Sequence, residues 1–499
     1  MDSERFVEGR GDYVEGEFVA ATRGETWTVR CPADRAIVVG RHTSSVDHVG
    51  RACEAARRAL AEWSACPVAA REPLLGALRE ALVDCREPLA RRIALESGKP
   101  LWEARGEVDA MAAKIALTLE LGTRALGHEA FETAEETIDA LPLGVVGVIG
   151  PFNFPGHLPL GQIAPALLFG NTVVFKPSEK TPGVGQLLAE LVHRAGFPPG
   201  VFNLVQGGVE VGRRLAAYEE LDALYFTGSV RAGRELARAM ADRPDCLLAL
   251  ELGGKNAALV LDDAEIDRAA RAVAHGAFVT AGQRCSATSR LVVHRAIVDP
   301  FLERLSALAR GIRVGFVEDE VFMSALVDEA ARARFLDAGA AAERAGFETL
   351  VGGHAVDVEG HEGAYVAPTI RIAPSKDVFV DGYTDTELFA PDLAVYVVDS
   401  DDEAVAIVNA SRFGLVATVH SASAERRAAI VRRLRVGVVH ENGSTAGASS
   451  RLPFGGLGLS GNHRPAGAFM ARHTIFPRAR LDATNRPIPA MPGMGEGVS

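Results

Sequence analysis

The sequence predicts an α/β protein in which strands and helices alternate along two regions of the chain. Its 499 residues exceed what one hydrophobic core holds and indicate two or three domains. In residues 145–176, the β-branched runs VVGVI and NTVVFK flank a helix-like LGQIAPALLFG, which is the β-α-β pattern of a parallel sheet. A second alternating region begins near residue 262 and reaches VGVVHEN. The fold expected is therefore two α/β units.

The first third of the chain predicts helices that pack around the first unit. Residues 1–30 predict an exposed lead-in with a short hairpin in DYVEGEFVAA. Residues 45–120 predict helices, because apolar residues recur at spacings of three and four with charge on the other face. Residues 125–141 alternate loosely and predict strands outside the main unit.

Residues 140–175 contain no Asp, Glu, Lys or Arg, but their five prolines prevent one continuous membrane-spanning helix. A second strand-helix unit follows in VFNLVQGG, the helix after Val209, DALYFTGS and VRAGRELARAMA. The strand CLLALEL then leads into Glu251, at a strand end where open α/β sheets place ligands. Beyond residue 262, DDAEIDRAARAVAHGAF predicts a helix that ends at the loop holding Cys285.

Composition narrows the class of protein. The net charge is −12 and no run of five basic residues occurs, which argues against nucleic acid and anionic membranes as partners. The acidic N-terminus lacks the apolar region of a signal peptide, so we expect a cytoplasmic location. Six cysteines occur without a CxxC pair, and no HExxH is present; we expect reduced thiols and no metal site.

Two motifs hold candidate catalytic groups, Glu251 in LALELGGKN and Cys285 in VTAGQRCSAT. A carboxyl in an apolar run suits a general base, and a thiol in a small-residue turn suits a nucleophile. Taken singly, each is more often a structural residue. Together, 34 residues apart, they resemble the catalytic pair of the aldehyde dehydrogenase superfamily.

The resemblance implies a fold and an assembly. It implies a Rossmann-type NAD-binding domain over residues 1–124 and 142–252, and an α/β catalytic domain over 253–440. A β-hairpin oligomerisation arm over 125–141 and 466–485 and a loose tail over 486–499 complete the layout. The family pairs this hairpin with a neighbour's sheet, so a homodimer or homotetramer is expected.

The resemblance also implies catalytic roles. Cys285 is the nucleophile toward an aldehyde, and the neighbouring Arg284 helps hold its thiolate. Asn153, in PFNFP, and the Cys285 N–H stabilise the oxyanion, although a turn asparagine bonded to its own backbone is the structural alternative. Glu251 activates the water that releases the acid.

NAD is the cofactor implied. Lys176 and Glu179, in KPSE, match the groups that bind the adenosine ribose, and the Glu179 carboxylate would repel the extra phosphate of NADP. A solvated charge pair is the structural alternative. The turn FTGSVRAG, which is not a GxGxxG fingerprint, matches the family's pyrophosphate turn through Gly228, Ser229 and Gly233.

TELFAP resembles the family's E-x-F-G-P motif, with Ala390 in place of glycine and Thr386 before the acid. Its Glu387 and Phe389 are therefore expected at the nicotinamide ribose.

PFNFPGHLPLGQIAPALLFGNT together with FGGLGLSGNHRPAG is most similar to the succinylglutamate semialdehyde dehydrogenases of arginine catabolism. That similarity implies an anionic aldehyde, with Arg464, His463 and Arg451 as partners for its carboxylates. A structural turn around Arg464 is the alternative. His440 and Glu441 depart from that group, which usually has a Trp-Asn pair.

Three other functions are open. Another aldehyde, or a broad range of aldehydes, fits the same catalytic residues. Coenzyme A-acylating dehydrogenases and acyl-phosphate reductases of similar fold tend to lack the Glu base, so Glu251 favours release of the free acid. A non-catalytic binding protein on this fold would have no chemical reason to keep Cys285, Glu251, Asn153 and Lys176 together.

Overall fold

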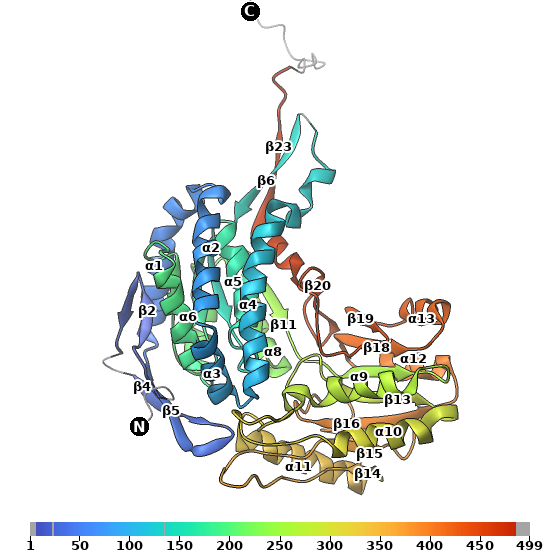
Figure 1. The fold of residues 1–499 in the computed structure, drawn as a ribbon. Helices are drawn as coiled ribbons and strands as arrows, with labels where there is room; N and C mark the ends of the chain where they lie inside the picture. Colours follow the sequence, from blue (N-terminus) through green and yellow to red (C-terminus); the bar gives the residue numbers. More distant parts are fainter. Residues whose placement is uncertain (1–5, 22–23, 134, 486–499) are drawn as a thin grey trace, which may run out of the picture.

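A computed structural model describes residues 6–21, 24–133 and 135–485 of the protein, and the expected tail over 486–499 lies outside these residues. Within them, the main architecture is two seven-stranded sheets with helices on both faces (Figure 1). The strand order of the first sheet is β11-β10-β7-β8-β9-β2-β3. Its strands are β2 (Asp12–Val14), β3 (Glu17–Val19), β7 (Val145–Ile149), β8 (Thr172–Lys176), β9 (Phe202–Leu204), β10 (Ala223–Thr227) and β11 (Leu247–Glu251). Strands β7 to β11 are parallel, whereas the β2-β3 hairpin adds antiparallel strands at one edge.

The first sheet is buried on both faces, which explains its nearly continuous apolar strands. Val146 and Val148 of β7 pack into one hydrophobic cluster, and Val145 and Ile149 pack into another on the opposite face. The first cluster is covered by α2 (Val68–Asp84), α3 (Arg86–Ser97), α4 (Leu101–Leu121), α5 (His157–Leu168) and α6 (Pro182–Arg194). The second is covered by α1 (Asp47–Ala65), α7 (Val209–Ala216) and α8 (Val230–Ala239).

The second sheet has the order β14-β15-β16-β13-β12-β18-β19 and is parallel except for the β14-β15 pair. Its strands are β12 (Asn256–Val260), β13 (Thr288–His294), β14 (Glu348–Val351), β15 (Thr369–Ile372), β16 (Asp392–Val398), β18 (Val416–His420) and β19 (Val438–Glu441). One face packs against α9 (Ile266–Phe278), α10 (Val298–Arg310) and α11 (Glu329–Arg344). The other face packs against α12 (Asp401–Asn409) and α13 (Ala424–Val431).

A two-stranded arm projects from the body (Figure 1). It pairs β6 (Glu136–Pro142) with β23 (Ile475–Leu481) in antiparallel register, from Ile475 opposite Pro142 to Leu481 opposite Glu136. A separate hairpin of β4 (Glu25–Cys31) and β5 (Asp34–Ser44), with β1 (Val7–Glu8) beside it, forms a small sheet near the N-terminus. Short 3-10 helices connect elements: η1 (Gly122–Leu126), η2 (His128–Ala130), η3 (Val279–Gly282), η4 (Arg295–Ile297) and η5 (Ala468–His473). Pairs of short strands complete the fold: β17 (Phe413–Gly414) with β21 (Leu457–Gly458), and β20 (Pro453–Phe454) with β22 (Ala466–Gly467).

Two local expectations are wrong. The lead-in is not all exposed, because β2 is buried at the edge of the first sheet beside β9. Asp12 anchors it there: its carboxylate pairs with His48 at 2.7 Å and accepts the Gln206 N–H at 2.5 Å. In the segment 125–141 the strand begins at residue 136, and η1 and η2 end at residues 126 and 130.

The chain passes directly from the first sheet to the second, and this junction determines where the site lies. Only residues 252–255 separate the end of β11 from the start of β12. The carboxyl end of the first sheet therefore faces the amino end of the second, where β12 and β13 begin. No helix within the described ranges is both long and apolar enough to cross a bilayer.

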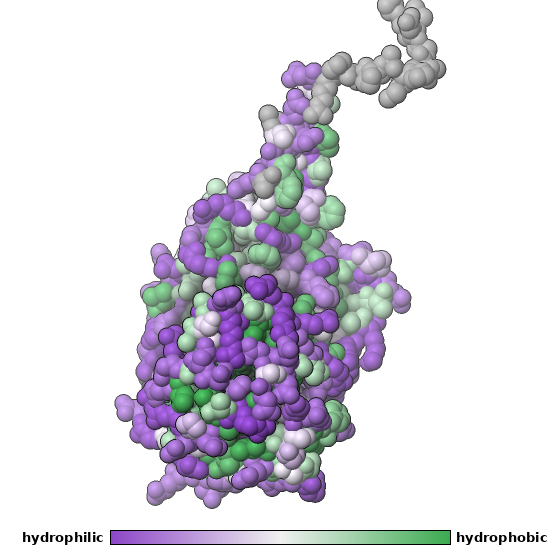
Figure 2. All heavy atoms as spheres, turned by 90° about the vertical axis from the view of Figure 1, so that its right-hand side faces the viewer, coloured by the Kyte–Doolittle hydropathy of each residue, from purple (hydrophilic) through white to green (hydrophobic). Residues whose placement is uncertain are grey.

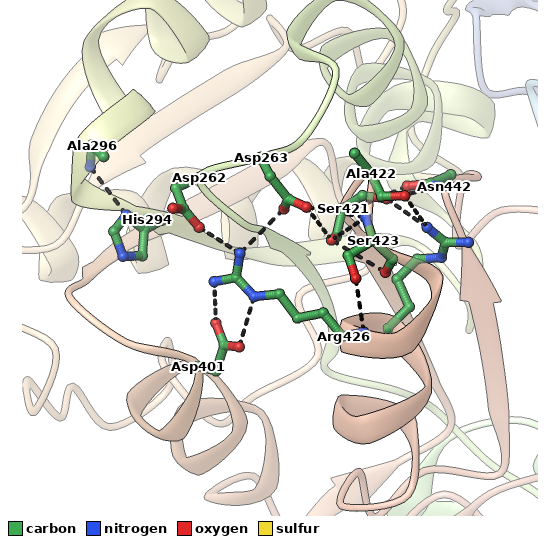
Figure 3. Close-up of polar contacts among 11 residues, drawn as sticks. Asp262, Asp263, His294, Ala296, Asp401, Ser421, Ala422, Ser423, Arg426 and Asn442 are labelled. Atoms are coloured by element: carbon green, nitrogen blue, oxygen red, sulfur yellow. Dashed lines mark hydrogen bonds and ion pairs between the residues drawn. The ribbon is translucent and has the colours of Figure 1, made fainter.

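The carboxyl edge of the second sheet is closed by ion pairs (Figure 3). Arg426 of α13 donates to both Asp401 oxygens at 2.6 and 2.8 Å, to Asp262 at 2.6 Å and to Asp263 at 3.3 Å. Open α/β sheets usually bind ligands at this edge. Here charged side chains that pair with one another occupy this end of the second sheet, whereas a cavity lies at its junction with the first sheet.

Candidate active site

A cavity of about 350 Å³ lies at the junction of the two sheets, and both Glu251 and Cys285 line it. Its walls come from α4, α5, the loop around Cys285 and the segment 447–450. Glu251 is the last residue of β11, and Cys285 lies three residues before β13. The structure thus brings the two predicted catalytic groups into one pocket, with Cys285 partly exposed to it.

The backbone that leads to Cys285 is strained. Thr280, Ala281 and Gly282 all have positive φ angles, 56°, 51° and 67°. A β-branched residue in this region is an uncommon, costly conformation that the surroundings must hold. Gly282 is required, because a Cβ there would lie 2.3 Å from the Ala390 carbonyl oxygen.

Glu103 of α4 holds this loop. Its carboxylate accepts the Thr280 N–H at 2.9 Å and the Thr280 hydroxyl at 2.5 Å. It also accepts a hydrogen bond from the Arg284 guanidinium at 3.1 Å. The buried Glu103 therefore fixes both the strained turn and the residue next to the thiol.

The two glycines that follow Leu252 allow other parts of the site to pack closely against the backbone. A Cβ on Gly253 would lie 1.9 Å from the Glu387 carboxylate, and a Cβ on Gly254 would lie 2.4 Å from the Cys285 carbonyl oxygen. The Asn256 amide donates to that same carbonyl at 2.6 Å. The LELGGKN motif thus ties the strand of the acid to the loop of the thiol.

Burial sets the protonation of both groups. Burial raises the pKa of Glu251 to about 8, although the Ala466 N–H and the Lys114 charge oppose it. Burial and then the Glu251 and Glu387 carboxylates raise the pKa of the Cys285 thiol to about 12. The resting thiol is therefore protonated, and a base must take its proton before attack.

The Arg284 guanidinium is bonded to the loop beside Cys285. Its guanidinium bonds Glu103 and donates to the Thr280 hydroxyl at 2.6 Å, and it lies 4.9 Å above the Phe154 ring. Its charge lowers the pKa of Cys285 less than burial and the carboxylates raise it. Arg284 therefore fixes the loop, and its charge only partly offsets the rise in the pKa of Cys285.

Asn153 is buried against the Cys285 loop. Its Nδ2 donates to the Gln283 carbonyl at 2.9 Å, and its own carbonyl accepts the Lys99 ammonium. An amide has two N–H groups, so one can still face a developing oxyanion. No bond joins the Cys285 N–H to an acceptor among the described residues.

Glu107, one turn after Glu103 on α4, holds the Asn153 segment. It accepts the Gly156 N–H at 3.0 Å, the His157 N–H at 3.1 Å and the Lys99 ammonium at 2.7 Å. The roles of Glu103 and Glu107 are not predicted by the motifs above. The available signal was two acids four residues apart in WEARGEV, on a helix face that the apolar pattern assigns to the core.

Lys176 ends β8 and is buried, and burial lowers its pKa. Its ammonium donates to the Pro177 carbonyl at 3.0 Å and lies 3.8 Å from the Glu179 carboxylate. The Glu179 side chain is partly exposed. The two charges stand at the carboxyl edge of the first sheet, as their positions after a strand predict.

The β10-α8 turn carries the other predicted cofactor residues. The Gly228 N–H donates to the Glu251 carbonyl at 3.0 Å. Ser229 caps α8, since its hydroxyl accepts the Ala232 N–H at 3.3 Å. A Cβ on Gly233 would lie 2.6 Å from the Leu252 side chain, so this glycine lets α8 pack closely on the segment after β11.

Glu387 points back into the junction. Its carboxylate accepts the Gly254 N–H at 2.8 Å, and burial raises its pKa to about 7. Phe389 has φ of 57°, whereas Ala390 is not among the positive-φ residues. The alanine that replaces a glycine in TELFAP is therefore free of backbone strain, and the left-handed position is one residue earlier.

The three residues predicted to bind substrate carboxylates do not line the cavity. Arg451 is exposed and pairs with both oxygens of Glu120, at 2.5 and 2.9 Å. His463 takes a positive φ of 66°, and Arg464 donates to its carbonyl at 3.4 Å. In the single chain, none of the three side chains therefore reaches the space beside Cys285 and Glu251.

Asn462, in the GNH sequence, has a structural role. Its side chain donates to the Leu248 carbonyl and accepts the Leu250 N–H, both at 2.8 Å. It thereby pairs with the free edge of β11 and fixes the strand that presents Glu251. No cluster of three His, Cys, Asp or Glu side chains suited to a metal ion occurs in the described ranges.

Comparisons with known proteins agree with this geometry. The model of the aldehyde dehydrogenase family matches residues 18–475. An N-succinylglutamate 5-semialdehyde dehydrogenase of Escherichia coli O139:H28 is 38% identical over 487 residues, 96% of each chain. NAD-dependent aldehyde dehydrogenase from Sinorhizobium meliloti superposes with a TM-score of 0.91 at 33% identity, over 98% of this chain and 97% of that one.

Betaine aldehyde dehydrogenase from Staphylococcus aureus, solved in complex with NAD+, superposes with a TM-score of 0.89 at 28% identity over 96% of both chains. The fold class predicted from the sequence is confirmed.

Proposed function

The chain belongs to the aldehyde dehydrogenase family, and from this we propose that it oxidises N-succinyl-L-glutamate 5-semialdehyde to N-succinyl-L-glutamate with NAD, in arginine catabolism. The observation that carries the chemistry is the cavity that Cys285 and Glu251 share. Support for the substrate comes from the relative that is 38% identical over 96% of its length.

In the proposed mechanism, the Cys285 thiol loses its proton to the carboxylate form of Glu251, which becomes the major form above about pH 8. The sulfur attacks the aldehyde carbon and forms a thiohemiacetal. The Asn153 amide and the Cys285 N–H donate to its oxyanion. Loss of the C–H hydride to the nicotinamide-binding side of the site gives a thioester, and Glu251 releases the thiol's proton to solvent. The Glu251 carboxylate then takes a proton from the attacking water, and the C–S bond breaks to free the acid and return the cysteine.

The residues at the first sheet's carboxyl edge fit NAD, which accepts a hydride when bound. Lys176 and Glu179 offer a donor and an acceptor for the hydroxyls of one ribose, and the buried Glu387 carboxylate offers acceptors for the other. The N-terminus of α8 suits a pyrophosphate, and the predicted residues Gly228, Ser229 and Gly233 lie there. The Glu179 charge disfavours NADP.

We assign the NAD-binding domain to residues 1–124 and 142–252, and the catalytic domain to 253–440. The strands of the first sheet lie within the first ranges, and those from β12 to β18 lie within the second.

The oligomerisation arm is assigned to residues 125–141 and 466–485, which include most of β6 and all of β23. An exposed two-stranded ribbon has unpaired edges that a second copy would cover, so we propose a homodimer or homotetramer, in the cytoplasm.

The test is the initial rate of NAD reduction by the purified protein on N-succinylglutamate 5-semialdehyde and, in parallel, on short aliphatic, aromatic and unsuccinylated glutamate semialdehydes. A preference of about 100-fold in kcat/KM, roughly 2.7 kcal/mol of transition-state discrimination, supports the substrate. A flat profile would leave a broad-specificity aldehyde dehydrogenase and reject the substrate.

A further inference from the structure

Lys114 of α4 is a cation without a partner inside the active-site cavity. It lines the cavity with Glu251 and Cys285, and its ammonium has no hydrogen bond or ion pair to any of the described residues. Burial lowers its pKa to about 8, against the opposing effect of the Glu251 charge. An ammonium that is removed from water and left unpaired costs free energy. An anionic ligand that pairs with it would offset this cost.

Helix α5 leaves room for this ammonium. Gly161 faces it, and a Cβ at that position would lie 3.4 Å from the Lys114 Cε and 3.5 Å from the Nζ. A Cβ at these distances would be in ordinary van der Waals contact with the lysine head. Gly161 thus places α5 directly beside the ammonium on one side of the cavity.

The other basic residues of the cavity lining are not available. Arg284 already bonds Glu103 and Thr280. Burial lowers the pKa of His157 to about 3, so its ring is neutral. Arg464 and Arg451 lie outside the lining. Among the residues that line the cavity, Lys114 is therefore the one cation that is free to pair with an anionic ligand.

We propose that Lys114 binds a carboxylate of the substrate and so selects dicarboxylate aldehydes over neutral ones. This inference rests on the proposed function. N-succinylglutamate 5-semialdehyde carries an α-carboxylate and a distal succinyl carboxylate, whereas simple aldehydes carry none. A carboxylate against a largely buried ammonium forms a strong charge-assisted hydrogen bond.

A second role has to be separated from this one. Lys114 also lowers the pKa of Glu251, so its removal would change the chemistry on every aldehyde. Such an effect is common to all substrates and cancels in a ratio of specificity constants. Recognition of a carboxylate does not cancel, because only the charged substrate loses it.

The experiment compares kcat/KM for N-succinylglutamate 5-semialdehyde with kcat/KM for hexanal in the full-length wild-type enzyme and in Lys114→Met. The proposal expects the ratio to fall roughly 100-fold in the variant, as for truncation of one partner of a buried charge pair. Lys376→Met is the matched control, because it removes a lysine that pairs with Glu403 outside the cavity and is expected to keep the wild-type ratio.

Two truncated substrates identify the carboxylate. N-acetylglutamate 5-semialdehyde lacks the distal carboxylate, and N-succinyl-4-aminobutanal lacks the α-carboxylate. The selective deficit of Lys114→Met should disappear for one of them. A wild-type ratio in Lys114→Met, or a deficit that persists with both truncated substrates, would overturn the inference. A wild-type enzyme without preference for the dicarboxylate would instead reject the proposed function itself.

Discussion

Glu103 and Thr280 are joined by two hydrogen bonds, from the Thr280 N–H at 2.9 Å and from its hydroxyl at 2.5 Å, across 177 residues of sequence. Thr280 lies in the left-handed region, and Cys285 follows five residues later. The position of the nucleophile therefore depends on an acid from a helix of the other α/β unit.

Glu103→Gln should lower kcat/KM by about 10- to 100-fold. The NH2 group of Gln would face hydrogen-bond donors that now bond to the carboxylate, and the loop that positions Cys285 would shift. We also expect a loss of about 1–3 kcal/mol in the free energy of unfolding. Steady-state kinetics and denaturant titration measure the two effects. Glu120→Gln, on the exposed side of the same helix, is the matched control. Full activity and full stability in Glu103→Gln would contradict the role assigned to this contact.

The rate of thioester hydrolysis should rise with pH through about 8. The pKa of Glu251 is raised to about 8, so the carboxyl is mostly protonated below that pH and cannot accept the proton of water. A single-turnover experiment should show about a tenfold rise per pH unit between pH 6 and 7, and a plateau above about pH 9. Removal of the Lys114 charge should move the inflection to higher pH. A flat profile from pH 6 to 9 would exclude Glu251 as the base.

The arm should be an interface between copies of the chain. Phe476 and Leu481 of β23 are 63% and 66% exposed in the single chain. Figure 2 shows apolar residues among hydrophilic ones on the surface of the arm. Phe476→Glu should dissociate the oligomer, since a charge would then have to be buried. Size-exclusion chromatography with light scattering measures the mass. Val83→Glu, at an exposed position of α2, is the control. An unchanged mass for Phe476→Glu would place the interface elsewhere.

The sequence predicted those features that depend on local pattern. Strands such as β7 and β8 are apolar on both faces and short, so their type and their place between helices follow from periodicity. Glu251 was correctly placed at the end of a strand. These features need no knowledge of which distant residues are neighbours.

Other features depend on contacts between distant residues. The burial of β2 rests on the bond from the Gln206 N–H to Asp12, across 194 residues. Arg451 looked available for a substrate, but it pairs with Glu120, which lies 331 residues earlier. Lys114 was overlooked because a single lysine on a helix is normally solvated, and only the packing of α4 on α5 encloses it.

The most direct test of the catalytic pair is the mass spectrum of Glu251→Gln after incubation with NAD and N-succinylglutamate 5-semialdehyde. Without the base, the thioester should form slowly and then accumulate, so we predict an N-succinylglutamyl adduct on the peptide that contains Cys285. Cys285→Ala, which should still bind NAD, serves as the control without adduct. An adduct on another cysteine, or wild-type turnover by either variant, would contradict the assignment of Cys285 and Glu251.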